Sequence, residues 1–592
     1  MIELEFNTRH SEALVIIGAG ATAKLGMPQT TEQSKLFREL SEAKDDANLK
    51  EILKEFFKDK DLDKMVSFLK VLDGDKKDSG NLKISDDDLE GMKNIYRHED
   101  DNQRLRNRIF ELRRDYDWNA AKKIIGICPD KKDGIDNLIR DLYSIIDKKL
   151  INNQSIKVLA DDDGNEEILP VSRLQGARNF LTLIINMLFA SAWHKITQGE
   201  KDGEFEKYKA FLNTFGKMMQ DEGHRFFAKG YKANTRDFYL FSCSFVSLNF
   251  EIVFPWILMN SHRKLNTEQK TYINSHPIKL WLDFGVEHRG RKTDDSKENL
   301  IPTLEFTESV ASRENEDDHI GTPLNRAGKF YFAHGSSNWR ECPVCGRMTF
   351  FYGGNHWEYK SPKLIPPFPI PFFEYEDYEL LTKQEWKWRK DLLHYDLMQC
   401  MHCESETFAH SAPMIMQTMY KSTPTSFLEE IQRNVKVSIE NARHIVLLGY
   451  QLPPDDTVWQ QTFAEAVRCR IQSNKKAYCT VVVGYKGEKR WLYQNEIENY
   501  VPKYKKDKDA ESYGVPAIEN AWAIFGKEHV RAWTGGIPEV FGNCAEADVK
   551  ELLYSSDFVE WKGTRQDKVE FLQSKVEFLL KNESSLKSKA RD

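Results

Sequence analysis

The sequence lacks the features of a membrane-spanning or nucleic-acid-binding chain. Its longest apolar run, residues 180–193, is interrupted by Thr182 and Asn186 and is too short to span a bilayer, so it predicts a core helix. The formal net charge of −7 gives no electrostatic reason to expect nucleic acid as a partner. No N-terminal segment joins basic residues to a long apolar core, so we expect no secretory signal. These absences predict a cytoplasmic protein that contacts no membrane and binds no nucleic acid directly.

Cysteine is scarce, with nine in 592 residues, but four of the nine form two Cys-x-x-Cys pairs. In a chain without a secretory signal, this spacing favours a metal site over disulfides. Two such pairs complete a tetrahedral four-thiolate zinc site, which is closed and therefore structural. Vestigial or redox cysteines are the alternative, and we expect His402 to bind no metal. Residues 346–399 separate the pairs and predict a small lobe. The four predicted ligands are Cys342, Cys345, Cys400 and Cys403.

The stretch "ALVIIGAGATAKLG", residues 13–26, reads as a buried strand followed by a glycine turn and a helix. Glycines at such a turn let the backbone approach a pyrophosphate, and the positive end of the next helix favours anions. The Gly-x-Gly-x-x-Gly pattern is incomplete, because Ala23 stands at the third glycine position. A tight turn that binds no ligand is therefore the alternative.

The periodicity of the chain predicts an α/β fold. Residues 36–235 are poor in glycine and proline and carry apolar residues at helical spacing, which predicts a large helical insertion. Thr30 and Gln33 have the spacing of a capping box at a helix start. Strands separated by long helical segments predict a doubly wound parallel sheet. The further strand-like runs are residues 238–248, 329–333, 445–448 and 480–483.

Five motifs follow one another in a distinctive order. The glycine turn comes first, then "FVSLNFE" with Asn249, "YFAHGSSNW" with His334, the paired Cys-x-x-Cys motifs, and "VLLGYQLPPDD". In this order the chain resembles the sirtuin family, and in particular the sirtuin-like NAD+ hydrolases of bacterial antiphage defence. The resemblance covers residues 14–28 and 236–484. It implies a Rossmann-type sheet with a zinc-binding small lobe.

The resemblance and the composition together predict six segments of the chain. The last of them contains an apolar stripe in residues 567–581, which packs either on the chain's own core or on a second subunit. The segments are 1–35, the first part of the Rossmann domain; 36–235, the helical insertion; 236–340, the Rossmann domain continued; 341–404, the zinc-binding lobe; 405–495, the end of the Rossmann domain; and 496–592, a C-terminal helical region.

The resemblance also implies roles for individual residues. Asn249 would contact the nicotinamide ribose and the attacking nucleophile, and His334 would be the general base. Glu251 stands beside the nicotinamide carboxamide, where the family usually has Asp. Tyr450 replaces a small hydroxyl residue, and Gly484 lies near the family's adenosine-binding asparagine. The implied NAD+-binding residues are Gly18, Ala19, Gly20, Ala21, Thr22, Glu251, Gly449, Tyr450 and Gly484.

Three functions could use such a pocket. Hydrolysis of NAD+ to ADP-ribose and nicotinamide ranks first, because the Phe-Gly-Glu and Asp-Phe-Arg segments of sirtuin deacylases are absent. A protein deacylase ranks second. A non-catalytic sensor of NAD+ or ADP-ribose ranks third, because binding alone would not require a base. The resemblance further implies a homo-oligomer, held inactive until infection, that works with a HerA-type ATPase or another protein of a defence operon and kills the cell by depleting NAD+.

Overall fold

The protein is described by a computed structural model in which helices, strands and side-chain contacts can be assigned over most of the chain. The described residues are 13–74, 84–97, 99–129, 138–159, 165–199, 201–228, 240–268, 278–284, 289–290, 324–350, 366, 368–371, 393–400, 403, 405–408, 414–416, 426–453, 456–472, 477–508, 510 and 512–553. The predicted apolar stripe at residues 567–581 and His402 both lie outside them.

Among the described residues, eight strands form a central sheet in the order β14-β15-β13-β12-β1-β4-β7-β5. All neighbours pair in parallel except β14, which runs antiparallel to β15 at one edge. The prediction of an α/β fold around a parallel sheet is thus confirmed. The strands are β1 (Ala13–Ile17), β4 (Leu240–Ser247), β5 (Ile278–Asp283), β7 (Leu324–Phe332), β12 (His444–Leu448), β13 (Tyr478–Val482), β14 (Trp491–Leu492) and β15 (Val530–Trp533).

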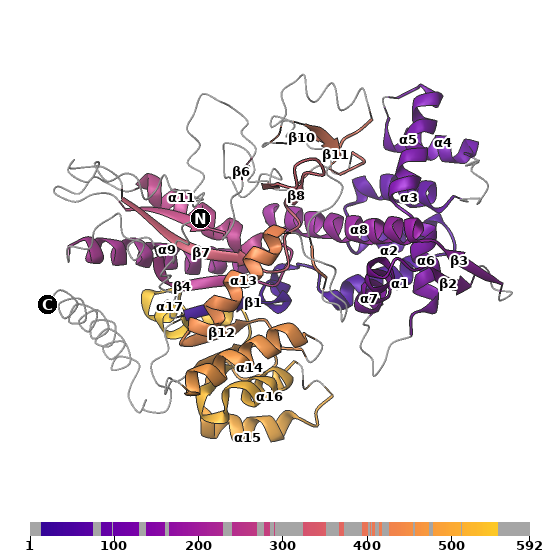
Figure 1. Ribbon diagram of the computed structural model, residues 1–592. Coiled ribbons are helices and arrows are strands. Elements are labelled where there is room, and N and C mark those ends of the chain that lie inside the picture. Colours follow the sequence, from indigo (N-terminus) through magenta and orange to yellow (C-terminus); the bar gives the residue numbers. More distant parts are fainter. Residues whose placement is uncertain are drawn as a thin grey trace.

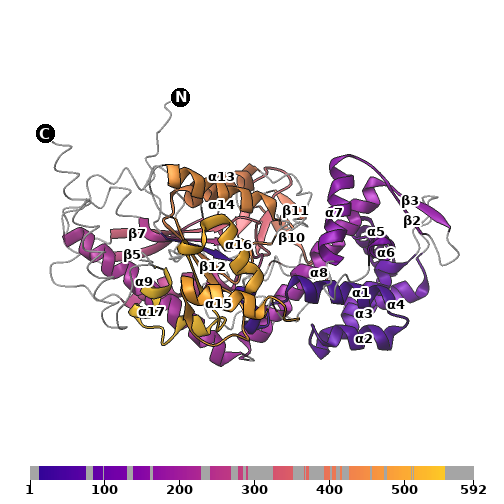
Figure 2. The same ribbon diagram turned by 90° about the horizontal axis from the view of Figure 1, so that it is seen from below.

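The innermost strands are apolar because both faces of the sheet are covered. Every residue of β1, β12 and β13 is buried, as expected for parallel strands between two layers of helices. Helices α13 (Ser426–Asn441) and α14 (Thr457–Gln472) lie over one face, and α9 (Asp202–Ala228) and α17 (Glu546–Leu553) over the other (Figure 2). The core therefore runs continuously through the sheet into both helical layers.

The strand order changes direction beside β1. From β1 the chain continues to β4 on one side, and it later crosses to β12 on the other side. In open parallel sheets, ligands bind at the carboxyl ends of the strands at such a switch point. The topology thus favours a site where β1, β4 and β12 end.

Three strands of the sheet, β5, β14 and β15, were not among the predicted runs. Strand β14 has only two residues, and each of the other two carries a basic residue that interrupts its apolar pattern: Lys279 in β5 and Arg531 in β15. Arg531 is buried, and its Nε donates to Thr480 Oγ1 of β13 at 2.8 Å. Because Arg531 is buried through a partner on another strand, the sequence of β15 itself does not show the apolar run that predicts a buried strand.

The described residues of the long segment after β1 are mostly helical. Figure 1 shows α1–α7 gathered on one side of the sheet, with α8 reaching from them to the sheet. Helix α9 packs against α11 (Val253–Glu268) and beside β5. The segment comprises α1 (Thr30–Glu42), α2 (Asp46–Lys54), α3 (Asp59–Asp73), α4 (Asp86–Ile95), α5 (Asn102–Asp115), α6 (Trp118–Ile127), α7 (Leu138–Ile151), α8 (Val171–Thr197) and α9, with a hairpin of β2 (Ile156–Leu159) and β3 (Glu166–Leu169).

Two local predictions in this segment can be compared with the structure. Helix α1 begins at Thr30 as expected, but the capping pair lies one residue earlier, because the Glu32 carboxylate accepts from the Gln29 N–H at 2.8 Å. The run at residues 180–193 lies inside α8 and is buried throughout, which confirms a core helix. Within the described residues, α8 is the one helix with the length and apolarity of a membrane span, and 89% of that window is buried inside the protein.

Candidate functional site

The register of the sheet aligns the ends of five neighbouring strands. Ile17, the last residue of β1, lies beside Ser247 of β4 and Leu448 of β12. Ser247 in turn lies beside Phe332 of β7, and Leu448 beside Val482 of β13. Each predicted strand-end residue follows one of these five ends within two positions, so all stand along one edge of the sheet. They are Gly18, Asn249, His334, Gly449 and Gly484.

The glycine turn packs directly against the turn that follows β12. Gly18 N–H donates to Leu448 O at 2.9 Å, and Gly20 N–H donates to Gly449 O at 3.1 Å. A Cβ atom on Gly18 would lie 2.5 Å from Gly449 O, closer than real Cβ contacts allow. Glycine at position 18 is therefore required by the approach of the second turn, and Ala19 and Gly20 remain exposed.

The helix expected directly after the glycine turn is absent. The chain instead makes two short 3-10 turns, Ala19–Ala21 and Ala23–Leu25, and the first α-helix begins at Thr30. Gly26, with φ of 85°, ends the second turn in the left-handed region that favours glycine. Gly26, three residues after the position where the Gly-x-Gly-x-x-Gly pattern requires glycine, thus has a structural role of its own.

Gly449 and Tyr450 form the opposite wall of this turn. Gly449 has φ of 65°, and a Cβ there would lie 2.1 Å from Ala21 N. The Tyr450 side chain is buried, and its hydroxyl donates to Asp456 Oδ2 at 2.7 Å. That hydrogen bond connects the turn after β12 to the residue directly before α14.

Asn249 and Glu251 join the ends of β1 and β4 in one buried network. Asn249 Nδ2 donates to Gly18 O at 2.9 Å and to Glu251 Oε1 at 3.0 Å. Thr22 Oγ1 donates to the same Glu251 oxygen at 3.1 Å, and Val253 N–H donates to Glu251 Oε2 at 2.6 Å. Burial raises the pKa of Glu251, while the hydrogen bonds from Val253, Asn249 and Thr22 oppose that rise. Its carboxylate also caps the N-terminus of α11.

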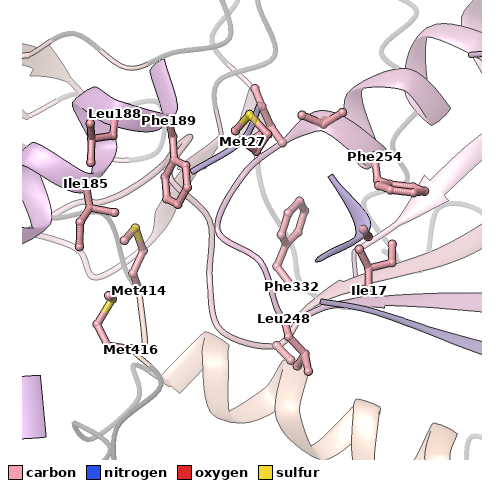
Figure 3. Close-up of a cluster of buried hydrophobic side chains, with 14 of the residues drawn as sticks. Ile17, Met27, Ile185, Leu188, Phe189, Leu248, Phe254, Phe332, Met414 and Met416 are labelled. Atoms are coloured by element: carbon pink, nitrogen blue, oxygen red, sulfur yellow. The ribbon is translucent and has the colours of Figure 1, made fainter. Parts of the chain in front are cut away.

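A cavity that is open to solvent lies beside this network. Its polar wall comes from the glycine turn and the end of β4, while Ile139 of α7 and Phe189 of α8 supply apolar surface from the helical segment. Figure 3 shows Phe189 facing the region of Met27, Met414 and Met416. The lining residues are Ala19, Thr22, Met27, Pro28, Thr30, Gln33, Ile139, Phe189, Leu248, Asn249, Phe250, Glu251 and Met416.

A second, smaller pocket shares Met27, Phe189 and Glu251 with the first. Helix α8 forms one side of it through Asn186, Phe189, Ala190 and Trp193, and Ser337, Asn338, Pro366 and Phe368 form the other. Helix α8 therefore faces the segment that follows β7 across this pocket.

His334 is fully buried and is not among the residues that line the first cavity. Its Nδ1 lies 3.2 Å from Leu248 O, one residue before Asn249, and its Nε2 accepts from Trp459 Nε1 at 3.1 Å. Trp459 stands in the first turn of α14 and is buried as well. Sequence reasoning missed Trp459, because a tryptophan near a helix start belongs to no motif of this site.

Gly484 is the predicted residue that the structure does not bring to the glycine turn. It has φ of 84°, and the backbone of residues 512–514 packs against it, with Ser512 O 2.9 Å from the position of a Cβ. These contacts with residues 512–514 explain why glycine stands at position 484.

The four cysteines of the two Cys-x-x-Cys pairs converge. Cys342 and Cys345 lie between β8 (Trp339–Glu341) and β9 (Met348–Phe350), and the second pair lies between β10 (Leu397–Gln399) and β11 (Glu406–Phe408). The sulfur of Cys342 lies 3.8 Å from that of Cys403, and the sulfur of Cys345 lies 3.7 Å from that of Cys400. All four sulfurs lie within 4.8 Å of one another.

This cluster has the geometry of a tetrahedral metal site. A zinc ion with Zn–S distances of about 2.3 Å places its ligand sulfurs about 3.8 Å apart. Gly346, with φ of 67°, lets the first turn close, and Gly346 N–H donates to Cys342 O at 2.9 Å. Hydrogen bonds from Ser405 lower the pKa of Cys403 to about 6, which favours the thiolate that a metal requires. The cluster could hold a zinc ion, and its four protein ligands would leave no open position for catalysis.

The candidate site thus consists of the two turns, the buried Asn249–Glu251 pair and, in a separate lobe, the four-cysteine cluster. Neither protein-family models nor curated proteins give a match to this chain.

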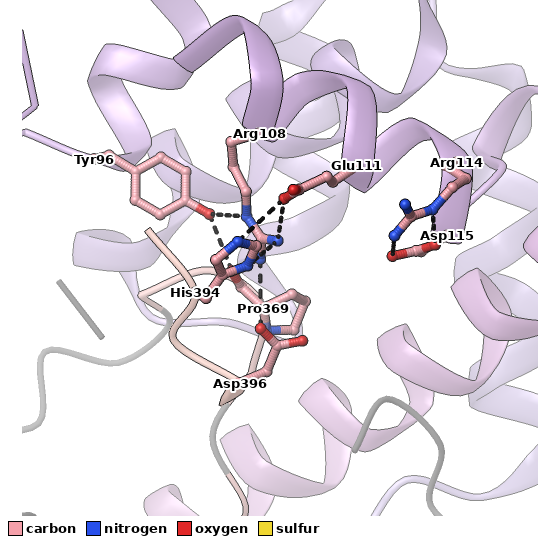
Figure 4. A network of polar contacts seen from close by, with 8 residues as sticks. All are labelled: Tyr96, Arg108, Glu111, Arg114, Asp115, Pro369, His394 and Asp396. Carbon is pink, nitrogen blue, oxygen red and sulfur yellow. Dashed lines mark hydrogen bonds and ion pairs between the residues drawn. The ribbon is translucent and has the colours of Figure 1, made fainter. Parts of the chain in front are cut away.

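A buried polar network joins helix α5 to residues that lie between the two cysteine pairs in the sequence (Figure 4). Arg108, which is 4% exposed, donates to Pro369 O at 2.8 Å and lies 3.5 Å from Asp396 Oδ1. Its Nη1 lies 2.8 Å from His394 Nδ1, and Tyr96 Oη also donates to Pro369 O, at 3.0 Å. Arg108 and Tyr96 thus link the helical segment to the lobe that carries the cysteines.

Proposed function

We propose that the chain is a sirtuin-like NAD+ hydrolase that converts NAD+ and water to ADP-ribose and nicotinamide. The observation that carries this proposal is the alignment of five strand ends at the switch point beside β1. That alignment places a glycine turn, a buried amide and a buried carboxylate around one cavity. A dinucleotide site at this edge agrees with the general rule for open parallel sheets.

The residue types suit cleavage of the nicotinamide–ribose bond. Nicotinamide leaves with the bonding electrons and becomes neutral, the ribose carbon passes through an oxocarbenium-like state, and a water oxygen bonds to that carbon. Asn249 would hold the ribose and the water, and His334 would accept the proton that the water or a ribose hydroxyl loses. Glu251 would face the carboxamide, and the exposed backbone at Ala19 and Gly20 would face the phosphates.

The position of α8 supports hydrolysis over deacylation. In a sirtuin deacylase, an acyl-lysine enters between the zinc-binding lobe and the main fold. Here Phe189 and Trp193 of α8 line the cavity in that region, opposite Pro366 and Phe368. An acyl-lysine would have to displace this helix, whereas a water molecule would not. We therefore assign water as the nucleophile.

The biological part of the proposal follows from the family resemblance. A cytoplasmic enzyme that cleaves NAD+ freely would kill its own cell, so we propose that this hydrolase stays inactive until infection. The control would come from homo-oligomer contacts or from a HerA-type ATPase or another protein of the same defence operon. Depletion of NAD+ would then cause abortive infection. In the proposed enzyme, the four-cysteine cluster holds zinc in a structural role.

The test is nicotinamide release from NAD+ by the purified chain and two variants, Asn249→Ala and His334→Ala. Both substitutions should remove most of the turnover, since each deletes a group that acts on the ribose or its nucleophile. Asn499→Ala, at an exposed position of α15 (Gln494–Tyr504), and His529→Ala, in a short 3-10 turn, are the matched controls. Undiminished turnover in a folded Asn249 or His334 variant would contradict the assignment. An acetylated peptide added with NAD+ tests for deacylation.

A further inference from the structure

The tautomer of His334 follows from its two neighbours. An indole N–H can only donate a hydrogen bond, so His334 Nε2 must be the acceptor in the 3.1 Å contact with Trp459. A neutral imidazole with a free lone pair on Nε2 carries its proton on Nδ1. The proton on Nδ1 then points at Leu248 O, 3.2 Å away, which can only accept. The two contacts therefore select one neutral tautomer.

The same lone pair is the one that a general base must offer. His334 has 0% exposure and Trp459 has 4%, so no ribose hydroxyl or water reaches Nε2 in this arrangement. A hydroxyl that donates its proton to Nε2 has to take the place of the indole N–H. Trp459 thus occupies the position from which the reacting proton would arrive.

The first turn of α14 is connected to the site that would hold the nucleotide. Tyr450 Oη donates to Asp456 Oδ2 at 2.7 Å, directly before α14, and Gln460 Nε2 donates to Leu452 O at 2.8 Å. Leu452 has φ of 50°, a left-handed conformation that is uncommon for a leucine. A ligand that moves the turn at Gly449 would therefore also move the start of α14, where Trp459 stands.

We propose that Trp459 is a positioning residue of the reaction, acting through His334. It keeps His334 in the Nδ1–H tautomer and occupies Nε2 until a hydroxyl of the substrate replaces the indole. This inference rests on the proposed NAD+ hydrolase activity. A hydroxyl of the substrate then competes with the Trp459 indole for His334 Nε2, because every productive complex has to break the Trp459–His334 hydrogen bond.

The decisive variant is Trp459→Phe, which keeps an aromatic ring and removes the N–H. A neutral hydrogen bond has a net value that corresponds to roughly a 2- to 10-fold change in an equilibrium. We expect the KM for NAD+ to fall by about that factor with kcat unchanged, since Leu248 O still sets the tautomer. Trp459→Leu, which also lacks a donor, provides a second variant if the first does not fold. Trp522→Phe is the control, because Trp522 Nε1 has no hydrogen-bond partner among the described residues.

A second measurement separates this inference from the proposed activity. Diethylpyrocarbonate acylates an unprotonated imidazole nitrogen, and peptide mass spectrometry reports the rate at each histidine. Acylation of His334 should be about 2- to 10-fold faster in Trp459→Phe than in the wild-type chain. His444, buried between Leu553 O and Thr480 Oγ1, should react at one rate in every variant.

The possible outcomes are distinct. Faster acylation of His334 without NAD+ turnover in any chain supports the positioning role and refutes the hydrolase. Turnover with an unchanged or higher KM in Trp459→Phe, or equal acylation of His334 in all chains, overturns the positioning role. A merely structural tryptophan would lower stability or kcat and would leave the KM no better.

Discussion

Replacing Gly18 with alanine should separate the two turns at the centre of the candidate site. Gly18 has φ of −105° and ψ of 176°, extended values that alanine adopts freely, so backbone strain adds nothing. The added Cβ would lie 2.5 Å from Gly449 O and 2.7 Å from Tyr450 Cα, and neither backbone atom can rotate away. Overpacking of this kind costs about 1–3 kcal/mol. Alanine also lowers the entropy of the unfolded chain, which stabilises the folded state by about 0.4–1 kcal/mol. The free energy of unfolding should therefore fall by about 1–2 kcal/mol.

The assay combines urea denaturation with hydrogen exchange. In Gly18→Ala, amides of residues 13–20 and 444–450 should exchange faster, because the Gly18 and Gly20 N–H groups bond to that second turn. Turnover of NAD+ should fall as well. The matched control is Gly126→Ala in α6, where a Cβ meets nothing within 4 Å and helix propensity predicts a gain of about 0.5–1 kcal/mol. Wild-type stability and protection in Gly18→Ala would refute the reasoning.

Two further predictions concern stability. The purified chain should contain one zinc ion per molecule. The Cys400→Ser variant should lose the metal and have a lower denaturation midpoint, because binding energy at a structural site is folding energy. Elemental analysis that finds no stoichiometric metal would contradict this prediction. Burial lowers the pKa of His262 from 6.5 to about 3, so the unfolded chain binds the extra proton as the pH falls below 6.5. The contribution of His262 to the free energy of unfolding is therefore fully present above that pH and is lost as the pH falls toward 3. About 2 kcal/mol of it is lost between pH 7 and pH 5. His262→Leu should remove that part of the acid sensitivity in urea denaturation, and an unchanged pH dependence would contradict the assignment.

The parts of the structure that sequence reasoning predicted are those with a local signal. The run at β1 is apolar throughout because both faces of the strand are covered, and the two Cys-x-x-Cys pairs carry their spacing in the chain itself. The predicted run at residues 445–448 lies within β12, and the run at residues 480–483 overlaps β13 as far as Val482. In each of these cases, a stretch of a few residues contains the whole pattern.

The contacts that escaped prediction join residues far apart in the chain. Thr22 and Glu251 are separated by 229 positions, and His334 and Trp459 by 125. Neither pairing follows from a pattern, because each depends on how a helix or turn is rotated once the sheet has formed. The same holds for the wall that α8 contributes to both cavities through Phe189.

The contacts of Arg108, which link helix α5 to the cysteine-bearing lobe, have a consequence for synthesis on the ribosome. Arg108 is made 261 residues before Pro369 and 288 residues before Asp396. At about 5–20 residues per second, its partners follow it roughly 15–60 seconds later. A cation cannot be buried without its partners at an acceptable free energy. The nascent helices must therefore leave Arg108 in water until the lobe arrives, and the final closure of this region waits for the later half of the chain.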